Sequence, residues 1–287
     1  MINIVATGKP ADGLLYYSYE YCSYLNSLGI DSTVVIIRNS NFSKEDYINA
    51  LSGKYIHCHN VEFDNFLPEE DDITLIMGRS MMSLSYKDFN SYTPFQQASL
   101  RYLFSGSVIS VYSENHPIVY PLALEFYSPQ RVIDLCDTEV YPNGVGAHFE
   151  KTINFDIYKP HTDDIQFKHL FLGTNKNYYA TIEKVIANYP DHGILTYDEK
   201  YINSNNNNIF APVKNLMGMF ETYVYTKDTF DPAPRIFQEC RYFGKDVIYL
   251  RDRSIVDGGS VYWKRDIKDP DIMPILKAIE EVYERQN

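Results

Sequence analysis

The sequence predicts an α/β protein built from two Rossmann-like domains with a cleft between them. Short apolar runs alternate with helical patterns, which is typical of parallel sheets covered by helices. The alternation starts at residues 2–6 and begins again at residues 169–172, after a linker-like Tyr158-Lys159-Pro160 segment. A chain of 287 residues has room for two small domains. We therefore expect an N-terminal domain over residues 1–160, a C-terminal domain over 161–268, and a closing helix within 269–287 that packs back on the first domain.

The first half opens with a strand, a turn, a helix and a second strand. Residues 2–6 are apolar, residues 7–13 carry turn residues, and residues 14–28 repeat Leu and Tyr at helical spacing. Gly29 suits the end of that helix. The β-branched run 32–37 predicts a buried parallel strand, which completes a βαβ unit. Further along we expect a helix over 43–52, an extended segment over 54–59, strands over 73–77 and 108–112, and a loop over 139–144.

The second half repeats the pattern. We expect a strand over 169–172, a helix over 177–187 and a strand over 193–197. The Asn-rich run 203–208 predicts a polar loop. In doubly wound sheets of this kind, ligands bind outside the carboxyl ends of the strands. The remaining expectations are a helix over 211–220, strands over 222–225 and 247–250, and an amphipathic helix over 271–285.

Composition indicates an ordinary globular protein, with 45% hydrophobic and 22% charged residues. No apolar run approaches the ~20 residues that a membrane helix needs, and no secretory leader is evident, so we expect a cytoplasmic protein. The four cysteines are scattered without a CxxC pair, which favours reduced thiols. The 26 Tyr against one Trp suit sugar contacts and interfaces, or reflect a biased composition.

Charge is strongly acidic and unevenly divided. The net charge is −12. Residues 1–160 hold 10 Lys and Arg against 19 Asp and Glu, which gives −9, and the remainder holds 16 against 19, which gives −3. The first half therefore attracts neither a phosphate backbone nor an anionic membrane by its bulk field.

The most informative segment is 222–259. A strand is followed by a loop that holds Asp231, and Pro234 suits the first position of a helix over 235–243. Gly244 suits the left-handed end of that helix. Arg235 and Glu239 are four residues apart, so they share one helix face. A helix N-terminus with an Arg in its first turn favours a phosphate group; the alternative is an ion pair on a solvated face.

This segment resembles the donor-binding core of GT-B glycosyltransferases, especially the retaining class with two Glu separated by seven residues. Asp231 and Glu239 have that spacing, and Gly258-Gly259 follow the next strand. The resemblance implies that Glu239 holds ribose hydroxyls and that Asp231 contacts the transferred sugar. The family has a Gly-rich backbone between its acids, whereas Pro232 and Pro234 here lack an N–H. Only Ala233, Arg235 and Ile236 can donate there, and we expect the Arg235 side chain to take over part of the diphosphate contact.

The resemblance extends to three other loops. In residues 171–177, Thr174, Asn175 and Lys176 match the loop that contacts the diphosphate. His116, after the strand at 108–112, matches a His that hydrogen-bonds the donor sugar. The first loop, with Gly8, Asp12 and Gly13, matches the loop that faces donor and acceptor. Asp12 is there the candidate for an acceptor-side base, or for the group that positions the acceptor hydroxyl.

The resemblance implies a glycosyltransferase that needs no metal. Its co-substrate is expected to be a nucleoside-diphosphate sugar, with a UDP-sugar as the leading candidate. The Pro234-Arg235-Ile236-x-x-Glu239-Cys240 pattern is similar to bacteriophage-encoded glycosyltransferases, some of which modify hydroxylated pyrimidines in DNA. A phage enzyme would act in the host cytoplasm. The acidic first half favours instead a glycan or a small molecule as acceptor. A non-catalytic two-domain binding protein and a sugar-nucleotide epimerase are the alternatives from other classes.

Several other patterns are discounted. His57 and His59 share one side of an extended segment, but two ligands do not make a structural zinc site. The chain has no GxxxxGK[ST] phosphate loop, no GxGxxG and no GxSxG. ATPases, dehydrogenases with the usual fingerprint and serine hydrolases of the elbow type therefore lose their main support.

Overall fold

The computed structural model divides the chain into two compact units, which are described separately. The first comprises Met1–Ile48, His57–Ile157 and Asp269–Asn287, and the second comprises Asn49–Ile56 and Tyr158–Lys268. A short piece of the N-terminal half, Asn49–Ile56, therefore belongs to the second unit. The structure describes residues 1–64, 66–78, 86–87, 89–111, 119–173, 183, 186–196, 207–226, 234–250, 261 and 264–284.

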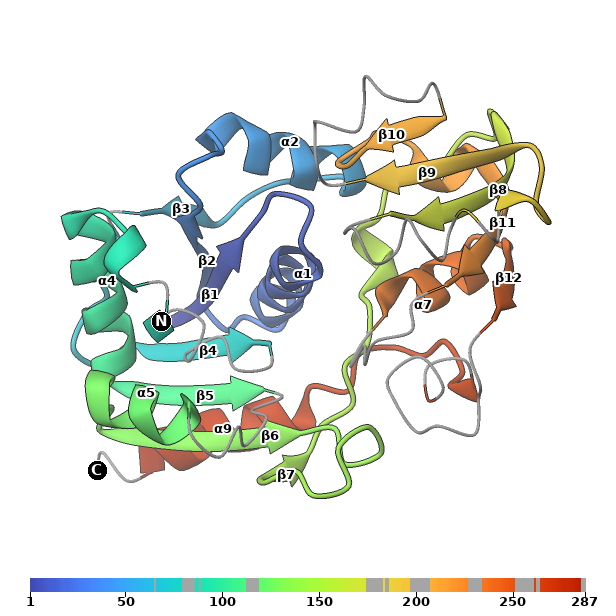
Figure 1. Cartoon of the computed structure of the whole chain (residues 1–287). Coiled ribbons are helices and arrows are strands. Elements are labelled where there is room, and N and C mark those ends of the chain that lie inside the picture. The colour runs from blue at the N-terminus through green and yellow to red at the C-terminus, as the bar shows by residue number, and fades with distance from the viewer. Residues whose placement is uncertain are drawn as a thin grey trace. The chain divides into compact units, whose positions relative to one another are not determined.

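The first unit is built on a seven-stranded parallel sheet with the order β3-β2-β1-β4-β5-β6-β7 (Figure 1). Strands β4 and β5 are buried at every position, and their uninterrupted apolar and β-branched residues explain why. The direction of strand addition reverses between β1 and β4. From β1 the chain adds β2 and β3 on one side, and from β4 it adds β5, β6 and β7 on the other. The strands are β1 Ile2–Gly8, β2 Ser32–Arg38, β3 Val61–Phe63, β4 Ile73–Met77, β5 Ser107–Val111, β6 Arg131–Cys136 and β7 Ala147–His148.

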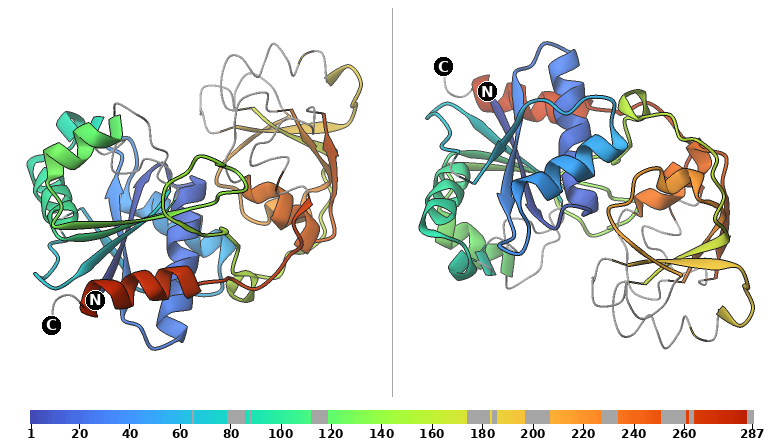
Figure 2. Two further views of the ribbon diagram at one scale, coloured as in Figure 1. Left: turned by 90° about the horizontal axis from the view of Figure 1, so that it is seen from below. Right: turned by 90° about the horizontal axis from the view of Figure 1, so that it is seen from above.

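Helices cover both faces of this sheet (Figure 2). Helices α4 and α5 pack through Leu100, Phe104 and Ala123 against Val5 and Ile76 of the sheet. Helix α4 has a capping box between Thr93 and Gln96. Both termini of the chain's described part lie in this unit, since α9 packs on β5 and β6. The helices are α1 Gly13–Ser27, α2 Lys44–Lys54, whose last residues belong to the second unit, α4 Pro94–Ser105, α5 Val119–Tyr127 and α9 Met273–Glu284.

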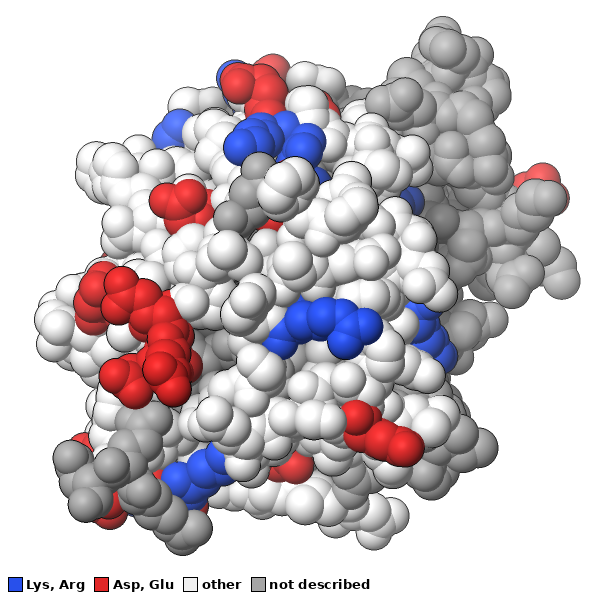
Figure 3. All heavy atoms as spheres, turned by 90° about the vertical axis from the view of Figure 1, so that its left-hand side faces the viewer, with Lys and Arg blue, Asp and Glu red and all other residues white. Residues whose placement is uncertain are grey.

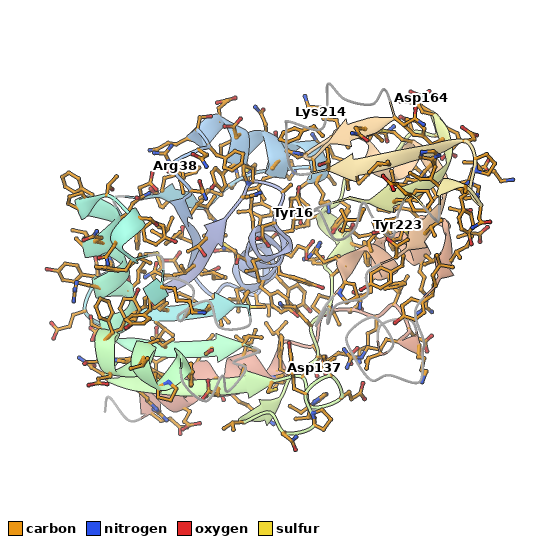
Figure 4. The ribbon with its side chains drawn as sticks, in the orientation of Figure 1. Tyr16, Arg38, Asp137, Asp164, Lys214 and Tyr223 are labelled. Atoms are coloured by element: carbon orange, nitrogen blue, oxygen red, sulfur yellow. The ribbon has the colours of Figure 1, made fainter. Side chains whose placement is uncertain are left out.

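The second unit has a five-stranded parallel sheet with the order β10-β9-β8-β11-β12. Its order reverses between β8 and β11, so each unit has one switch point. The central strands carry buried aromatic side chains, among them Phe171 on β8 and Tyr223 on β11; Figure 4 labels Tyr223. The elements are β8 Phe167–Leu172, β9 His192–Thr196, β10 Asn208–Phe210, β11 Phe220–Tyr225, α7 Arg235–Tyr242 and β12 Asp246–Tyr249.

Two expected elements are wrong. The segment 211–220 holds only a short 3-10 helix at Leu216–Gly218 before β11 begins. Asn215 adopts a left-handed conformation and exchanges hydrogen bonds with Thr162, which interrupts any helix. The segment 54–59 is not a strand, because α2 continues to Lys54 and only an isolated antiparallel bridge joins Tyr55 to Tyr158. The helix expected over 177–187 lies largely outside the described residues.

Candidate functional site

Each switch point brings a different set of predicted residues to the carboxyl edge of its sheet. In the first unit, β1 ends at Gly8 and leads through a turn into α1, whose first residue is Gly13. In the second unit, β8 ends at Leu172, just before the predicted loop 174–176, and β11 leads to α7. Open α/β sheets bind ligands at such edges. The topology therefore supports two local candidate sites, one in each unit.

Helix α7 is fixed on its sheet by aromatic packing. The Phe237 ring lies 4.9 Å from Tyr225 of β11 and 5.6 Å from Tyr249 of β12, measured between ring centroids. The two tyrosine rings are themselves stacked, 5.4 Å apart. The helix ends as predicted, with Gly244 at φ +67° and the Lys245 N–H bonded to the Cys240 carbonyl. Pro234, expected at the first helical position, is the N-cap.

Arg235 and Glu239 form a buried pair on α7. Their exposed fractions are 7% and 5%, so the alternative of an ion pair on a solvated face is wrong. The guanidinium donates from Nε and Nη2 to Glu239 Oε1, at 3.3 and 3.2 Å. Two buried opposite charges of this kind need further polar partners, because each has lost its hydration.

Lys54 and Tyr158 supply those partners. Lys54 Nζ donates to Glu239 Oε1 at 2.6 Å, and the Tyr158 hydroxyl donates to the same oxygen at 3.0 Å. The Tyr158 hydroxyl also accepts from Arg235 Nη2 at 2.5 Å. We call these four residues the Glu239 cluster; all belong to the second unit. Burial by itself would raise the pKa of Glu239, but the Lys54 and Arg235 charges outweigh it and lower the pKa to about 2.

The hydrogen bonds of the Glu239 cluster are asymmetric. Among the described residues, every donor to Glu239 reaches Oε1 and none reaches Oε2. An ionised carboxylate can accept about four hydrogen bonds over its two oxygens. Glu239 is thus an anion whose Oε1 is held by several donors, while the described residues place no donor on Oε2.

No sequence pattern predicts Lys54 or Tyr158 as residues of this site. Lys54 lies 185 residues before Glu239 and closes a helix in the N-terminal half, and Tyr158 lies in the segment interpreted as a linker. The Tyr158 ring packs edge-on against Tyr55, with centroids 5.2 Å apart, and Lys54 Nζ lies 5.5 Å from its centroid. A buried Arg–Glu pair signals that further partners exist, but no local pattern indicates which residues they are.

The first unit places Gly8, Asp12 and Gly13 together at the end of β1. Gly8 has φ +107°, and a side chain there would meet Asp12 Oδ2 at 3.0 Å. Its carbonyl accepts a hydrogen bond from the Tyr47 hydroxyl. Asp12 is the N-cap of α1, and its Oδ1 accepts from the Leu14 N–H at 3.0 Å. The loop is therefore locally fixed, with a half-buried carboxyl at its end.

The Asp12 carboxyl has the opposite electrostatics to Glu239. Burial raises the pKa of Asp12, and the Leu14 N–H and the charges of Lys151 and Lys9 only partly offset this. Lys151 is itself 3% exposed, and its Nζ lies 4.4 Å from the Tyr17 ring centroid. A carboxyl with a raised pKa is better suited to exchange a proton than an ordinary surface Asp.

Other predicted residues lie outside the described part of the chain. These are His116, Asp231, Thr174, Asn175 and Lys176, together with Gly258 and Gly259. Ile236 is described: it is the second residue of α7 and is partly buried.

The described residues include no group of three or more His, Cys, Asp and Glu side chains placed to hold a metal ion. The rings of His57 and His59 stack with centroids 5.5 Å apart, on one side as expected. No helix in the described ranges has the length and apolarity to cross a membrane.

Solved structures similar to this chain include two of alpha-glucosyltransferases. An alpha-glucosyltransferase in complex with UDP and a 13-mer DNA containing an HMU base aligns with a TM-score of 0.52 and 11% identity, over 99% of this chain and 89% of that chain. An alpha-glucosyltransferase in complex with UDP aligns with a TM-score of 0.51 and 11% identity, over 99% and 90%. No protein-family model matches the sequence, and no curated protein matches it significantly. The likeness and the two parallel sheets establish the predicted α/β fold of the GT-B kind.

Proposed function

We propose that the chain is a glycosyltransferase that moves a sugar from a nucleoside-diphosphate sugar to an acceptor hydroxyl. A UDP-sugar is the leading candidate for the donor. The observation that carries the proposal is the state of Glu239, which lies on the helix that follows switch strand β11. Its carboxylate is held as an anion by two cations, Lys54 and Arg235. In the resembled family, the acid at this position binds ribose hydroxyls. The fold shared with two UDP-bound alpha-glucosyltransferases supports the same assignment.

The proposed diphosphate site is the amino end of α7 with Arg235. The N-cap residue, Pro234, has no side-chain acceptor and makes no side-chain cap hydrogen bond to the first turn of α7. The helix dipole and the guanidinium charge both favour an anion there. They would stabilise the charge that develops on the leaving diphosphate, so the reaction would not depend on a metal. Thr174, Asn175 and Lys176 are proposed to extend this site, and His116 and Asp231 to contact the sugar.

The proposed acceptor side is the β1–α1 loop of the first unit. Gly8 and Gly13 flank Asp12, whose carboxyl is fixed by the start of α1. In the protonation cycle, ionised Asp12 would accept the proton of the acceptor hydroxyl as the hydroxyl attacks the sugar. Its raised pKa suits that step, because the resulting acid is weaker than a surface Asp.

Two acceptor classes are supported by different observations. One of the similar structures holds DNA with an HMU base, which favours a modified base in DNA. Charge favours a glycan or a small molecule, because residues 1–160 carry −9. On the face drawn in Figure 3, the largest group of charged side chains is acidic, and other acidic and basic side chains are scattered over the rest of that face. A DNA acceptor requires phosphate contacts and hence a steep loss of activity with salt; a glycan does not.

The test has two stages. Thermal unfolding is measured with UDP, GDP, ADP and dTDP and with the glucose conjugate of each. The melting temperature should rise most with UDP and UDP-glucose, since a ligand that binds the folded state stabilises it. Radiolabelled UDP-glucose is then offered with HMU-containing DNA, unmodified DNA and a panel of glycans. Transfer to any acceptor supports the proposal. Binding without turnover would instead identify a binding protein, and release of an isomerised sugar without acceptor an epimerase.

A further inference from the structure

The Glu239 cluster contains a lysine that the proposed reaction has not yet used. Lys54 Nζ makes the shortest hydrogen bond to Glu239, 2.6 Å, and its side chain is 23% exposed. Its backbone is tied into the same unit, because the Lys54 carbonyl accepts from the Lys159 N–H at 2.9 Å. The Lys159 ammonium in turn donates to the Ser52 carbonyl at 2.5 Å. The end of α2 is therefore anchored where Lys54 reaches the carboxylate.

We infer that Lys54 is a positioning residue for nucleotide binding, which together with Tyr158 holds Glu239 Oε1 so that Oε2 is presented to the ribose hydroxyls. This inference rests on the proposed function. Oε1 accepts from three side chains that come from α2, the segment before β8 and α7. Such a carboxylate cannot rotate without breaking several charge-assisted bonds. The carboxylate is therefore already oriented before the nucleotide binds, and binding carries no further entropic cost for orienting it.

The arrangement also predicts which nucleotides are preferred. An anionic oxygen aimed at the sugar is satisfied only when a ribose hydroxyl donates to it. A deoxyribose leaves that oxygen desolvated and unpaired, and polar sites of this kind discriminate strongly against analogues that lack the hydroxyl. We expect UDP to bind at least about tenfold more tightly than 2′-deoxy-UDP or 3′-deoxy-UDP. Lys54 would thus set ribose specificity without contacting the nucleotide.

The pH dependence of nucleotide binding reports the charge on Glu239. A lysine that only supported the fold would not change that dependence. Among the described residues, the charged and titratable groups that act most strongly on Glu239 are Lys54, Arg235 and Tyr158, and the Cys240 thiol is its neighbour on α7. Burial opposes ionisation, and Lys54 is the largest of the influences that lower the pKa of Glu239. Without Lys54 that pKa rises, so protonation of Glu239 would begin to weaken binding at a higher pH.

The experiment compares Lys54→Met, Lys54→Arg and the matched control Lys214→Met. Lys214 is an exposed lysine of the same unit, labelled in Figure 4. Affinities for uridine and for UDP are measured between pH 4.5 and 8 by calorimetry and ligand-observed NMR. Lys54→Met should weaken both ligands by a similar factor, about tenfold at neutral pH, as loss of one charge-assisted bond would. The factor should grow as the pH falls, while Lys54→Arg and Lys214→Met stay within about threefold of wild type.

Several results would overturn the inference. A loss confined to UDP would mean that Lys54 contacts phosphate directly, and an unchanged pH profile would mean that it only supports the fold. If Lys54→Met does not fold, Lys54→Gln carries the same test. In a Glu239→Gln background, Lys54→Met should add little, because the effect passes through the carboxylate. Wild-type protein that binds neither uridine nor UDP would remove the proposed function itself, whereas normal wild-type binding with an insensitive Lys54→Met removes only this inference.

Discussion

Asp12, a half-buried carboxyl of the first unit, and Glu239, a buried carboxyl of the second, have pKa values that shift in opposite directions. Asp12 is the N-cap of the helix that follows switch strand β1, and Glu239 lies within α7, the helix that follows switch strand β11. Burial raises the pKa of Asp12, whereas the pKa of Glu239 falls to about 2. The same fold thus presents one carboxyl that readily holds a proton and one that is a permanent anion.

The difference comes from contact distance. Glu239 Oε1 lies 2.6 Å from the Lys54 ammonium and 3.2 Å from an Arg235 nitrogen, so Coulomb attraction exceeds the cost of burial. Asp12 has lysines in its surroundings, but its direct bond is to the neutral Leu14 N–H. Direct contact with a cation therefore keeps a carboxyl ionised, whereas burial without such contact raises its pKa.

The largest effect is expected for Asp12→Asn. If Asp12 is the acceptor-side base, its amide cannot accept a proton, and kcat for transfer should fall by roughly a hundredfold or more. Donor affinity should stay within about threefold, because Asn caps the helix as well as Asp does. In wild type, kcat/KM should rise with pH across the pKa of Asp12, at pH values above those at which an ordinary Asp ionises.

The matched control for Asp12 is Asp46→Asn, an exposed aspartate in the first turn of α2 whose carboxylate accepts from Ser43. This variant should transfer sugar at the wild-type rate. A loss of about tenfold or less in Asp12→Asn would mean that Asp12 positions the hydroxyl and takes no proton. Full activity in Asp12→Asn would remove its assignment altogether.

Glu239→Gln should have the next largest effect, and on binding rather than on chemistry. The amide keeps the shape but not the charge, so UDP should bind roughly ten- to a hundredfold more weakly. Folding should also suffer, because Lys54 and Arg235 lose their anion, at a cost of about 3 kcal/mol. Calorimetry and thermal unfolding check both, with exposed Glu221→Gln of β11 as the control. Wild-type affinity in Glu239→Gln would contradict the ribose assignment.

Arg235→Ala should lose less affinity, and unequally between ligands. Removal of the guanidinium takes one contact from the diphosphate and one support from Glu239, so UDP should bind about tenfold more weakly and uridine about threefold. Exposed Arg241→Ala on the same helix removes the same charge and should leave both affinities unchanged. Equal losses for UDP and uridine would show that Arg235 serves only Glu239, and the diphosphate site would then lie elsewhere.

Local signals explain what the sequence could predict in both regions. Pro234 and Gly244 bracket α7, and the apolar run 73–77 coincides with β4, since caps and buried strands depend on neighbouring residues. Strand β6 was missed because its first four positions are only partly buried and include charged side chains. The prediction of a helix over 211–220 is wrong because Asn215 forms hydrogen bonds with Thr162, which lies far away in the sequence and is not part of any local pattern.

The same limit applies to the candidate site. The spacing of Arg235 and Glu239 predicted one shared helix face, and the structure shows them bonded and buried. Lys54 and Tyr158 decide the charge state of that pair, but they come from 185 and 81 residues away along the chain. Residue chemistry was therefore predictable where it is local, whereas the electrostatics of the site depend on tertiary contacts.

The smallest expected effect concerns stability and has opposite signs at the two carboxyls. The pKa of folded Asp12 is raised above its unfolded value of 3.8, so wild type loses stability as pH rises through that window. Asp12→Asn does not titrate, and at neutral pH it should melt about 2 °C above wild type, with the gap closing toward pH 4. Glu239 contributes stability that is complete above pH 4.5 and is lost as pH falls toward its folded pKa of about 2. Calorimetric melting of wild type, Asp12→Asn and Glu239→Gln from about pH 2.5 to pH 8 checks both signs, because the Glu239 contribution is lost only below pH 4.5. A gap for Asp12→Asn that does not change with pH would show that burial does not set the pKa of Asp12, and the contrast between the two carboxyls would then rest on Glu239 alone.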